Sequence, residues 1–408
     1  MHKIERLLQT LAPKGVEFRK LGEVCEILDN RRIPIAKNKR KPGIYPYYGA
    51  NGIQDYIDSY IFDGDFVLVG EDGSVINKDN TPVVNWASGK IWVNNHAHVL
   101  QTKNELKLKF LYFYLQTIDV SYCVAGTPPK INQENLKKIT IPIPPLEIQQ
   151  EIVKILDAFT ELNTELNTEL NARKKQYQYY QNMLLDFNSI HSNHKDAKMS
   201  AKTYPKNLKT LLQTLAPKGV EFRKLGEVLE YDQPNKYCVT SKEFDKSYPT
   251  PVLTAGKTFI LGYTNEKDNI YQASKSSPVI IFDDFTTATQ WVDFPFKVKS
   301  SAMKILFSKN PTINIRFIFF YMQTIPYNIS GEHARHWISR YSQLEVPIPP
   351  LEIQQEIVKI LDQFLALTTD LQTGIPAEIE ARKKQYQYYR EKLLTFKPLT
   401  PHKEVKKC

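Results

Sequence analysis

The feature that most constrains this chain is an internal repeat, because any fold must accommodate the same blocks twice. Three blocks recur unchanged: PIPPLEIQQEIVKILD at 142–157 and 347–362, LLQTLAPKGVEFRKLGEV at 7–24 and 211–228, and ARKKQYQYY at 172–180 and 381–389. They follow one another in the same order in both halves. A repeat of this kind indicates one structural unit used twice. We therefore expect each half to consist of a globular part followed by a long helix.

The globular parts are expected over about 16–141 and about 220–346. Strand-like runs at 66–69 and 279–282 alternate with short helical patterns, and Gly, Pro and Asn mark the turns between them. This mixture predicts an α/β fold. The polar segment 188–206 has no periodicity and is interpreted as the linker between the halves.

The long helices carry a heptad seam. After Pro144-Pro145, apolar residues recur at alternating steps of four and three, which is typical of a coiled coil. The residues assigned to the seam and to partner docking are Ile148, Ile152, Leu162, Leu166, Leu170 and Tyr177 in the first helix, and Ile353, Ile357, Leu367, Leu371 and Tyr386 in the second. Within TELNTELNTELN at 160–171, two steps of four follow each other and form a stutter. Gly374 and Pro376 are expected to kink or interrupt the second helix.

Two helices of about 40 residues would each span on the order of 60 Å. Because their seams match, they most simply pair with each other, and a pseudo-two-fold axis between the halves would make the pair antiparallel. The globular parts would then lie at opposite ends of a rod. The alternative is two separate helices, each packed on its own globular part.

Charge and cysteine content restrict the setting in which the chain works. The net charge of +10 indicates a polyanionic partner, but ribosome, RNA, DNA and an anionic membrane would all satisfy it. The four cysteines include no C-x-x-C pair, which argues against a disulfide framework or a zinc ribbon and for a reducing compartment. The N-terminal stretch lacks the apolar core of a secretory signal, and the apolar runs are too short to span a bilayer. We predict a cytoplasmic protein.

The two halves differ most in one loop region. GTPPKINQENLKKITIPIPP at 126–145 corresponds to GEHARHWISRYSQLEVPIPP at 331–350, and the residues between the glycine and the prolines are unlike. Two basic globular parts on a spacer of defined length suit the reading of two separated sites on one polymer. On duplex DNA the spacer would set the distance between half-sites. Unlike loops on a shared frame therefore predict an asymmetric, bipartite target.

These features resemble a known family. The duplicated PIPPLEIQQEIVKILD, the ARKKQYQYY block, the NNHAHVL stretch at 94–100 and the tandem TELN units are similar to the specificity (S) subunit of type I restriction-modification systems. The resemblance implies two globular α/β target-recognition domains related by pseudo-two-fold symmetry and joined by two long helices that form an antiparallel coiled coil. It also implies that the chain reads double-stranded DNA, that its helices dock two modification (M) methyltransferase subunits, and that restriction (R) motor-nuclease subunits join the complex.

The same resemblance implies a non-catalytic chain that holds no cofactor, in a complex that would use S-adenosylmethionine, ATP and Mg. The blocks divide the chain into target-recognition domain 1 (1–141), a central helical spacer (142–187), the linker (188–206), target-recognition domain 2 (207–346), a C-terminal helical spacer (347–396) and a tail (397–408).

Motifs for chemistry are missing or incomplete. The Asn/Asp-Pro-Pro-aromatic loop of an amino-methyltransferase does not occur. PVLTAGKT at 251–258 ends like a phosphate-binding loop, but Pro251 replaces the first glycine and has no N–H for a phosphate. The histidine pairs lack the cysteines or carboxylates that would complete a metal site. His96 and His98 alternate as on a strand, so one of them is expected to face the core. FDGDF…GEDGS at 62–74 has several carboxylates and is interpreted as the acidic turn of a β-hairpin.

Residues that read bases must be polar, accessible and located in the unlike loops. The candidates are Asn94, Asn95, His96, Thr127 and Lys130 in the first half, and Glu332, His333, Arg335, His336 and Arg340 in the second. The densest basic cluster supplies candidates for phosphate contacts: Arg31, Arg32, Lys37, Lys39, Arg40 and Lys41. For each base-reading candidate the alternative is a solvated loop position or a phosphate contact.

Three functions are compatible with the sequence. The leading one is a non-catalytic DNA-specificity subunit. The second is a self-sufficient DNA-modifying or DNA-cleaving enzyme, against which the missing motifs count. The third is a stand-alone coiled-coil DNA-binding or scaffold protein without restriction-modification partners.

Overall fold

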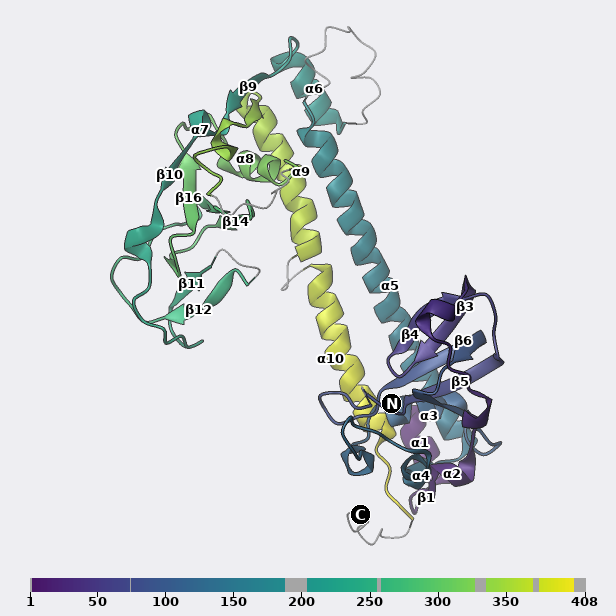
Figure 1. Ribbon diagram of the computed structural model, residues 1–408. Helices are drawn as coiled ribbons and strands as arrows, with labels where there is room; N and C mark the ends of the chain where they lie inside the picture. The colour runs from purple at the N-terminus through teal and green to yellow at the C-terminus, as the bar shows by residue number, and fades with distance from the viewer. Residues whose placement is uncertain are drawn as a thin grey trace. The chain divides into compact units, whose positions relative to one another are not determined.

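The structure is a computed structural model that describes residues 2–73, 75–187, 204–254, 258–326, 335–369 and 374–399. Its packing divides the chain into two compact units, whose elements are labelled in Figure 1. Unit 1 is Met1–Thr168 together with Glu378–Cys408, and unit 2 is Glu169–Ala377. Division by repeat blocks follows the order of the chain, whereas each packing unit combines one globular part with portions of the long helices.

Unit 1 is built around a six-stranded sheet in the order β2-β7-β5-β6-β3-β4. Its elements are α1 (His2–Leu11), β1 (Glu17–Lys20), α2 (Leu21–Val24), β2 (Cys25–Ile27), η1 (Asp29–Arg31), η2 (Lys37–Lys39), β3 (Pro42–Gly49), β4 (Gly52–Ile57), β5 (Phe62–Gly70), β6 (Val84–Val93), β7 (Ala97–Thr102), α3 (Leu108–Leu115), η3 (Ser121–Cys123), α4 (Gln133–Lys138), β8 (Thr140–Ile143), the first part of α5 (Leu146–Leu185) and most of α10 (Ile375–Leu394). All neighbouring strands of the sheet are antiparallel except β3 and β6, which are parallel. The apolar run around FLYFYL forms α3, which packs against β5 and β6. Separately, β1 pairs with β8.

Unit 2 repeats this design with a divided sheet. Its elements are the remainder of α5, α6 (Lys206–Leu215), β9 (Glu221–Lys224), α7 (Leu225–Val228), β10 (Leu229–Asp232), η5 (Pro234–Tyr237), β11 (Thr250–Leu253), β12 (Ile260–Thr264), β13 (Val279–Asp283), β14 (Thr289–Val292), β15 (Lys297–Val298), β16 (Met303–Ser308), α8 (Ile315–Met322), η6 (Tyr341–Gln343), β17 (Glu345–Ile348) and α9 (Leu351–Thr369). Four strands form one sheet in the order β10-β16-β13-β14, three form another in the order β12-β11-β15, and β17 pairs with β9.

A proline accounts for the division of the second sheet. In unit 1 the single strand β6 pairs with β5 along most of its length and with β3 at Trp92 and Val93. In unit 2 the same two roles fall to β14, which pairs with β13, and to β15, which pairs with β11. Pro295 lies between β14 and β15 and has no N–H to donate to a ladder, so a continuous strand is disfavoured there.

The long helices pair in antiparallel fashion within each unit. In unit 1, Phe159 of α5 stacks on Tyr389 of α10, with ring centroids 5.5 Å apart. In unit 2, Tyr180, which lies later in α5, stacks on Phe364 of α9 at 5.0 Å. The earlier position in α5 meets α10, and the later position meets α9, which precedes α10 in the chain. The paired helices therefore run in opposite directions, as the repeat predicts. The helices also pack on the globular parts, so the alternative of packing on each domain describes a second contact rather than a competing one.

The predicted seam is largely the buried side of these helices. Ile148, Ile152, Ile353 and Ile357 are buried, and so is Leu166, whereas Leu162, Leu170, Tyr177 and Tyr386 are half-buried. Leu367 is exposed, and its neighbour Thr368 takes the buried position at the end of α9. The Thr368 hydroxyl can be buried because it donates to the Phe364 carbonyl at 2.9 Å. Leu371 lies outside the described residues.

The TELN units are helical throughout and belong to the continuous 40-residue helix α5. The hydroxyls of Thr160, Thr164 and Thr168 each donate to the carbonyl four residues earlier, at 2.9 Å. These bonds satisfy the side chains of a residue type that is only a middling helix former. The second helix is interrupted as predicted near Gly374 and Pro376, since α9 ends at Thr369 and α10 begins at Ile375. Among the described residues, none of the helices combines the length and the apolar character needed to cross a membrane.

The repeated PIPPLEIQQ stretch has an internal structural role. Gln149 is fully buried at the start of α5, where its amide donates to the carbonyls of Pro144 (2.7 Å) and Glu105 (2.9 Å). Its carbonyl oxygen accepts the N–H of Lys107 at 2.7 Å, immediately before α3. Gln354 makes the same three kinds of bond in unit 2, to Pro349, Thr312 and the N–H of Asn314 before α8. One glutamine thus joins two helix starts in each unit.

We expect Gln149→Ala to destabilise unit 1 by about 2–4 kcal/mol, because it leaves the buried Pro144 carbonyl and the part-buried Lys107 N–H and Glu105 carbonyl without this partner. Gln150→Ala is the matched control: its side chain is exposed, and the change should alter the free energy of unfolding by less than about 0.5 kcal/mol. Denaturant titration of the full chain measures both. Equal stability of the two variants would contradict the structural role.

Candidate nucleic-acid interface

Four segments of unit 1 converge where β5 ends, and two of them carry candidate base readers. The residue that follows β5, Glu71, lies between the 94–98 turn and the 125–133 loop. Its N–H donates to the carbonyl of His96 at 2.8 Å, and its carbonyl accepts the N–H of Ile131 at 2.9 Å. The N–H of Gly73 donates to Pro129 at 3.1 Å. The 71–73 segment therefore fixes the main chains of both loops to the end of one central strand.

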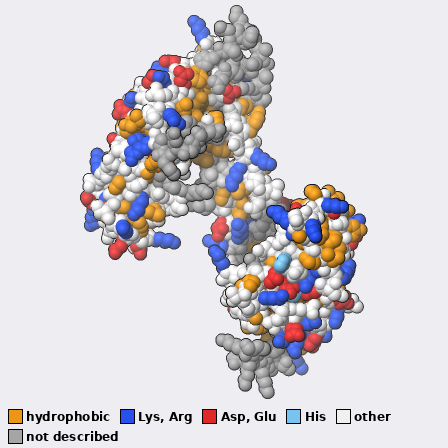
Figure 2. Space-filling view, viewed as in Figure 1, with side chains coloured by type: hydrophobic (Ala, Val, Ile, Leu, Met, Phe, Trp, Pro, Cys, Tyr) orange, Lys and Arg blue, Asp and Glu red, His pale blue; other side chains and the backbone are white. Residues whose placement is uncertain are grey.

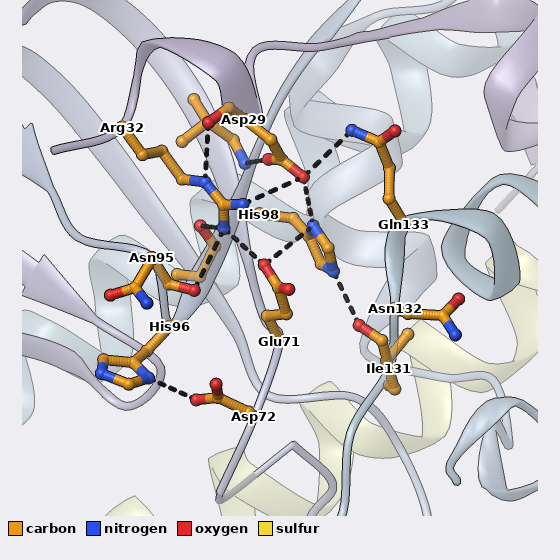
Figure 3. Close-up of polar contacts among 12 residues, drawn as sticks. Asp29, Arg32, Glu71, Asp72, Asn95, His96, His98, Ile131, Asn132 and Gln133 are labelled. Carbon is orange, nitrogen blue, oxygen red and sulfur yellow. Dashed lines mark hydrogen bonds and ion pairs between the residues drawn. The ribbon is translucent and has the colours of Figure 1, made fainter. Parts of the chain in front are cut away.

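A buried network of charges lies beneath these loops (Figure 3). His98 of β7 is fully buried, and its Nδ1 lies 2.6 Å from Asp29 Oδ2 and 3.7 Å from Glu71 Oε2. Its Nε2 donates to the carbonyl of Ile131 at 2.7 Å. Arg32 completes the network: its Nη1 lies 2.6 Å from Glu71 Oε2 and 2.8 Å from the carbonyl of Ala97. One set of side chains thus holds η1, the 94–98 turn and the 125–133 loop together.

The surroundings of Asp29 favour its charged form. Burial raises the pKa of Asp29, but the hydrogen bond from His98, the charge of Arg32 and the N–H of Val99 outweigh it, so this pKa lies below its ordinary value. Asp29, Glu71 and His98 offer ligand atoms within 4.8 Å of one another, as a cation site would. Here the guanidinium of Arg32 supplies the positive charge, and both ring nitrogens of His98 are engaged. We interpret the group as a structural network of ion pairs and hydrogen bonds.

The candidate base readers of unit 1 divide into exposed and buried residues. Asn95, His96, Thr127 and Lys130 are exposed. His96 pairs with Asp72, and Lys130 lies 3.0 Å from Glu71. Asn94, in contrast, is buried: its amide oxygen accepts the N–H of His96 at 2.8 Å and its NH₂ group contacts Gln54. The interpretation of Asn94 as a base reader is therefore corrected to a turn-forming role, because its polar atoms serve its own unit.

The basic cluster of unit 1 is divided in the same way. The side chains of Lys37, Lys39 and Lys41 are exposed, which suits phosphate contacts. Arg31 is exposed as well, but its guanidinium lies over the Phe62 ring at 4.7 Å and donates to the Ile61 carbonyl at 3.2 Å. Arg32 belongs to the buried network, and Arg40 lies over the Tyr47 ring at 4.1 Å and 3.4 Å from Asp55. The guanidinium groups of Arg32 and Arg40 are held by the protein, so their assignment to the DNA backbone is corrected.

Figure 2 shows that Lys and Arg side chains are spread over the visible face of each unit, with Asp and Glu between them. Surface charge therefore locates the interface less well than the converging loops do.

Unit 2 repeats the main-chain arrangement with different side chains. Strand register makes Asp284, after β13, the counterpart of Glu71, and Lys304 of β16 the counterpart of His98. The N–H of Asp284 donates to Ala302 at 3.2 Å, and its carbonyl accepts the N–H of His336 at 2.9 Å. Lys304 is buried, 3.6 Å from Asp284 Oδ2, and donates to Gln233. A buried cation and an acid thus hold the loop ends in both units.

The candidate readers of unit 2 follow the same division. Arg335 and Arg340 have exposed side chains. His336 is buried, so its assignment as a base reader is corrected to a place in the core, beside the buried Trp337. The N–H of Trp337 donates to Asp284 Oδ1 at 2.9 Å. Glu332 and His333 lie outside the described residues.

Sequence reasoning anticipated part of this site. The alternation of His96 and His98 predicted that one would face the core, and His98 does. The acidic stretch at 62–74, interpreted as a hairpin turn, is mostly strand: Phe62–Gly70 is β5, and only the residues after Gly70 enter the connection to the antiparallel strand β6. Ser74 lies outside the described residues. The network partners Asp29 and Glu71 were missed, because their contacts with His98 and Arg32 link residues far apart in sequence.

Comparisons with known proteins show the family to which the chain belongs. The model of the type I restriction modification DNA specificity domain matches residues 13–176 and again residues 217–381. A putative type I restriction enzyme specificity subunit of Haemophilus influenzae is 34% identical over 412 residues, covering 96% of this chain and 98% of that protein. A type I restriction enzyme specificity subunit of Escherichia coli is 55% identical over 188 residues, covering 44% of this chain and 45% of that protein. The crystal structure of a type I S subunit from M. genitalium superposes with a TM-score of 0.63 at 18% identity, covering 93% of this chain and 96% of that one, and shows a shared fold.

The chain therefore belongs to the specificity subunits of type I restriction-modification systems. It is a subunit with two DNA-recognition domains and no catalytic function of its own.

Proposed function

We propose that this chain reads an asymmetric, bipartite double-stranded DNA target, with one half-site for each unit. The observation that carries the proposal is that the same main-chain hydrogen bonds surround Glu71 and Asp284, while the exposed residues on the loops they hold are unlike. Lys130 and Arg335 occupy corresponding positions just before the residue bonded to the strand end. A common frame with different polar side chains suits two different base sequences.

The helices are proposed to set the spacing and to dock two modification subunits. The isoleucines first assigned to docking, Ile148, Ile152, Ile353 and Ile357, are buried in their own units, so docking must use other residues. Internal packing explains why the two copies of a repeated block have the same residue at a buried position. It does not explain why they have the same apolar residue at an exposed position. Tyr179 and Tyr388, in the two copies of ARKKQYQYY, are 61% and 58% exposed.

The exposed tyrosines have equivalent surroundings in the two copies. The two lysines at the third and fourth positions of each block are exposed as well: Lys174, Lys175, Lys383 and Lys384. Leu11 of α1 and Leu215 of α6 are a second identical pair of exposed apolar residues. Exposed aromatic residues are frequent anchors of protein interfaces. Two identical surfaces indicate two copies of one partner, for which the modification subunit is the proposal.

The proposed complex also contains restriction subunits and acts on DNA in the cytoplasm. Its S-adenosylmethionine, ATP and Mg would be held by those partners rather than by this chain. A stand-alone scaffold would instead select no DNA sequence and bind no methyltransferase.

The first prediction concerns the separation of the half-sites. Arg335→Ala combined with Arg340→Ala should weaken discrimination at one half-site by about tenfold to a hundredfold and leave the other unchanged, since each good base contact contributes about 1–3 kcal/mol. His96→Ala combined with Lys130→Ala is the matched variant and should affect only the other half-site. Binding-site selection from a randomised DNA pool, with the chain in complex with its modification subunits, measures both. Equal loss of discrimination at both half-sites in either variant would overturn the assignment of one half-site to each unit.

The second prediction concerns stoichiometry. Tyr179→Ala and Tyr388→Ala should each weaken one of two modification-subunit sites by about thirtyfold, the loss of a typical aromatic anchor. Native mass spectrometry should then show mainly one bound subunit for each single variant and none for the double variant. Tyr56→Ala is the control, because Tyr56 is comparably exposed on β4 but lies outside the repeated blocks. Retention of two subunits by the double variant would rule out this surface.

The third prediction concerns the spacer. Deleting Thr164–Asn167 removes one TELN unit and shortens α5 by about 6 Å, at about 1.5 Å per residue. The deletion also removes the stutter and restores a continuous heptad seam, so the chain should fold. At about 3.4 Å per base pair, the selected target should have a spacer shorter by about one to two base pairs, with both half-sites unchanged. Insertion of a further TELN unit should lengthen it, and an unchanged spacer with full affinity in both variants would refute a length-setting role.

A further inference from the structure

A buried basic side chain occupies the same position in the two units. His98 of β7 is 0% exposed and Lys304 of β16 is 2% exposed. Strand pairing establishes the correspondence: Val69 faces His98 in unit 1, and Phe282 faces Lys304 in unit 2, two residues before the acid in each case. Burying a charge is unfavourable unless it is paired and hydrogen-bonded, so its occurrence twice needs an explanation.

The partners of this cation correspond as well. Each cation faces the acid that follows the neighbouring strand, Glu71 or Asp284. Each also contacts a polar residue shortly after the first strand of the sheet, Asp29 in unit 1 and Gln233 in unit 2. The acid is the residue whose main chain bonds both loop ends. Lys304 therefore lies one contact away from the main chain of the loops, and His98 also bonds that main chain directly through the Ile131 carbonyl.

We propose that His98 and Lys304 are positioning residues for DNA recognition: each holds the acid beside it in place and thereby sets the conformation of the loops that carry the exposed candidate readers. This inference rests on the proposed reading of one half-site by each unit. Without Lys304, the buried Asp284 carboxylate would lose an ion-pair partner, and it would be better stabilised by turning toward water. Without His98, Asp29 and the Ile131 carbonyl would each lose a hydrogen bond, whereas Glu71 would keep Arg32 and Lys130. The main chain at Asp284 in unit 2, or at Ile131 in unit 1, would then shift, and the loops bonded to it would move with it.

The two cations differ in one chemical respect. Both ring nitrogens of His98 face acceptors, Asp29 Oδ2 and the Ile131 carbonyl, so both bonds require a doubly protonated ring. The other charged groups around this ring are Glu71, after β5, and Arg32, after η1, with Lys130 of the 125–133 loop on the far oxygen of Glu71; Gln133 of α4 donates to Asp29. Removing one ring proton would break one of these two bonds and set a nitrogen lone pair against an acceptor.

Lys304 is the corresponding side chain in unit 2. Its ammonium group faces Asp284, Gln233 and the face of the Tyr231 ring at 4.9 Å. An imidazolium gives up a proton near neutral pH, whereas an ammonium group does so only several pH units higher. Loop positioning in unit 1 should therefore depend on pH and that in unit 2 should not.

The experiment uses the full chain in complex with its modification subunits and exchanges the two cations. His98→Gln removes the charge, His98→Lys supplies the cation of unit 2, and Lys304→His supplies that of unit 1. For each variant, binding-site selection is carried out between about pH 6 and about pH 9, and discrimination is quantified separately for each half-site. Thermal unfolding of each variant and retention of the untouched half-site report whether the protein is folded.

We expect the wild-type chain to lose discrimination at the unit 1 half-site as pH rises, while the other half-site stays constant. His98→Gln should lower discrimination at the unit 1 half-site about tenfold at the lower pH, the effect of one lost charge-assisted bond. His98→Lys should restore it and abolish the pH dependence, and Lys304→His should transfer a pH dependence to the unit 2 half-site.

Unchanged discrimination in His98→Gln, or a His98→Lys profile identical to that of the wild type, would overturn the inference. A merely structural role would lower stability without transferring a pH dependence from one half-site to the other. Failure of the proposed function would appear differently, as a wild-type complex that selects no bipartite sequence at any pH.

Discussion

The position of the recognition loops depends on the main-chain bonds of a single residue after a central strand. Glu71 donates to the 94–98 turn and accepts from the 125–133 loop, and Asp284 does the same in unit 2. A loop held by main-chain hydrogen bonds can carry any side chain that fits without altering its path. This separation of frame from side chains explains how two units with one architecture can present Lys130 in one case and Arg335 in the other. Rigid strands beneath the loops supply the fixed reference that recognition of base edges requires.

Identity between the two halves has two physical origins. Gln149 and Gln354 are identical because each must satisfy an N–H and two carbonyls at buried helix starts, which a shorter side chain cannot do. Tyr179 and Tyr388 occupy equivalent positions although most of each side chain is exposed. Packing within their own units therefore does not explain why both copies have tyrosine there. The same repeated sequence therefore contains residues required by the fold and residues available for a partner. Exposure distinguishes the two groups, whereas the repeat alone does not.

The two units also show how far one architecture tolerates change. Pro295 divides the second sheet into two, yet the strands beneath the recognition loops keep their order and register. The buried cation changes from imidazole to ammonium, and its companion from Asp29 to the neutral Gln233. In unit 1 the additional carboxylate of Asp29 is accompanied by an additional basic residue, Arg32, which pairs with both Asp29 and Glu71. In unit 2 the Lys304 ammonium group faces one carboxylate and one amide. What the two arrangements share is the pairing of buried charge beside the loop ends.

The sequence by itself determined the duplicated α/β organisation, the helical seam, the antiparallel pairing and the family. These follow from local periodicity and from exact repetition, both of which are visible without knowing any long-range contact. Only the tertiary structure decided which polar residues of the loops are exposed. Asn94, His336, Arg32 and Arg40 resemble their accessible neighbours in sequence but are held inside the protein by distant partners. Asp29 meets His98 across 69 positions of the chain, and no local pattern encodes such a contact, because it arises from the order of strands in the sheet.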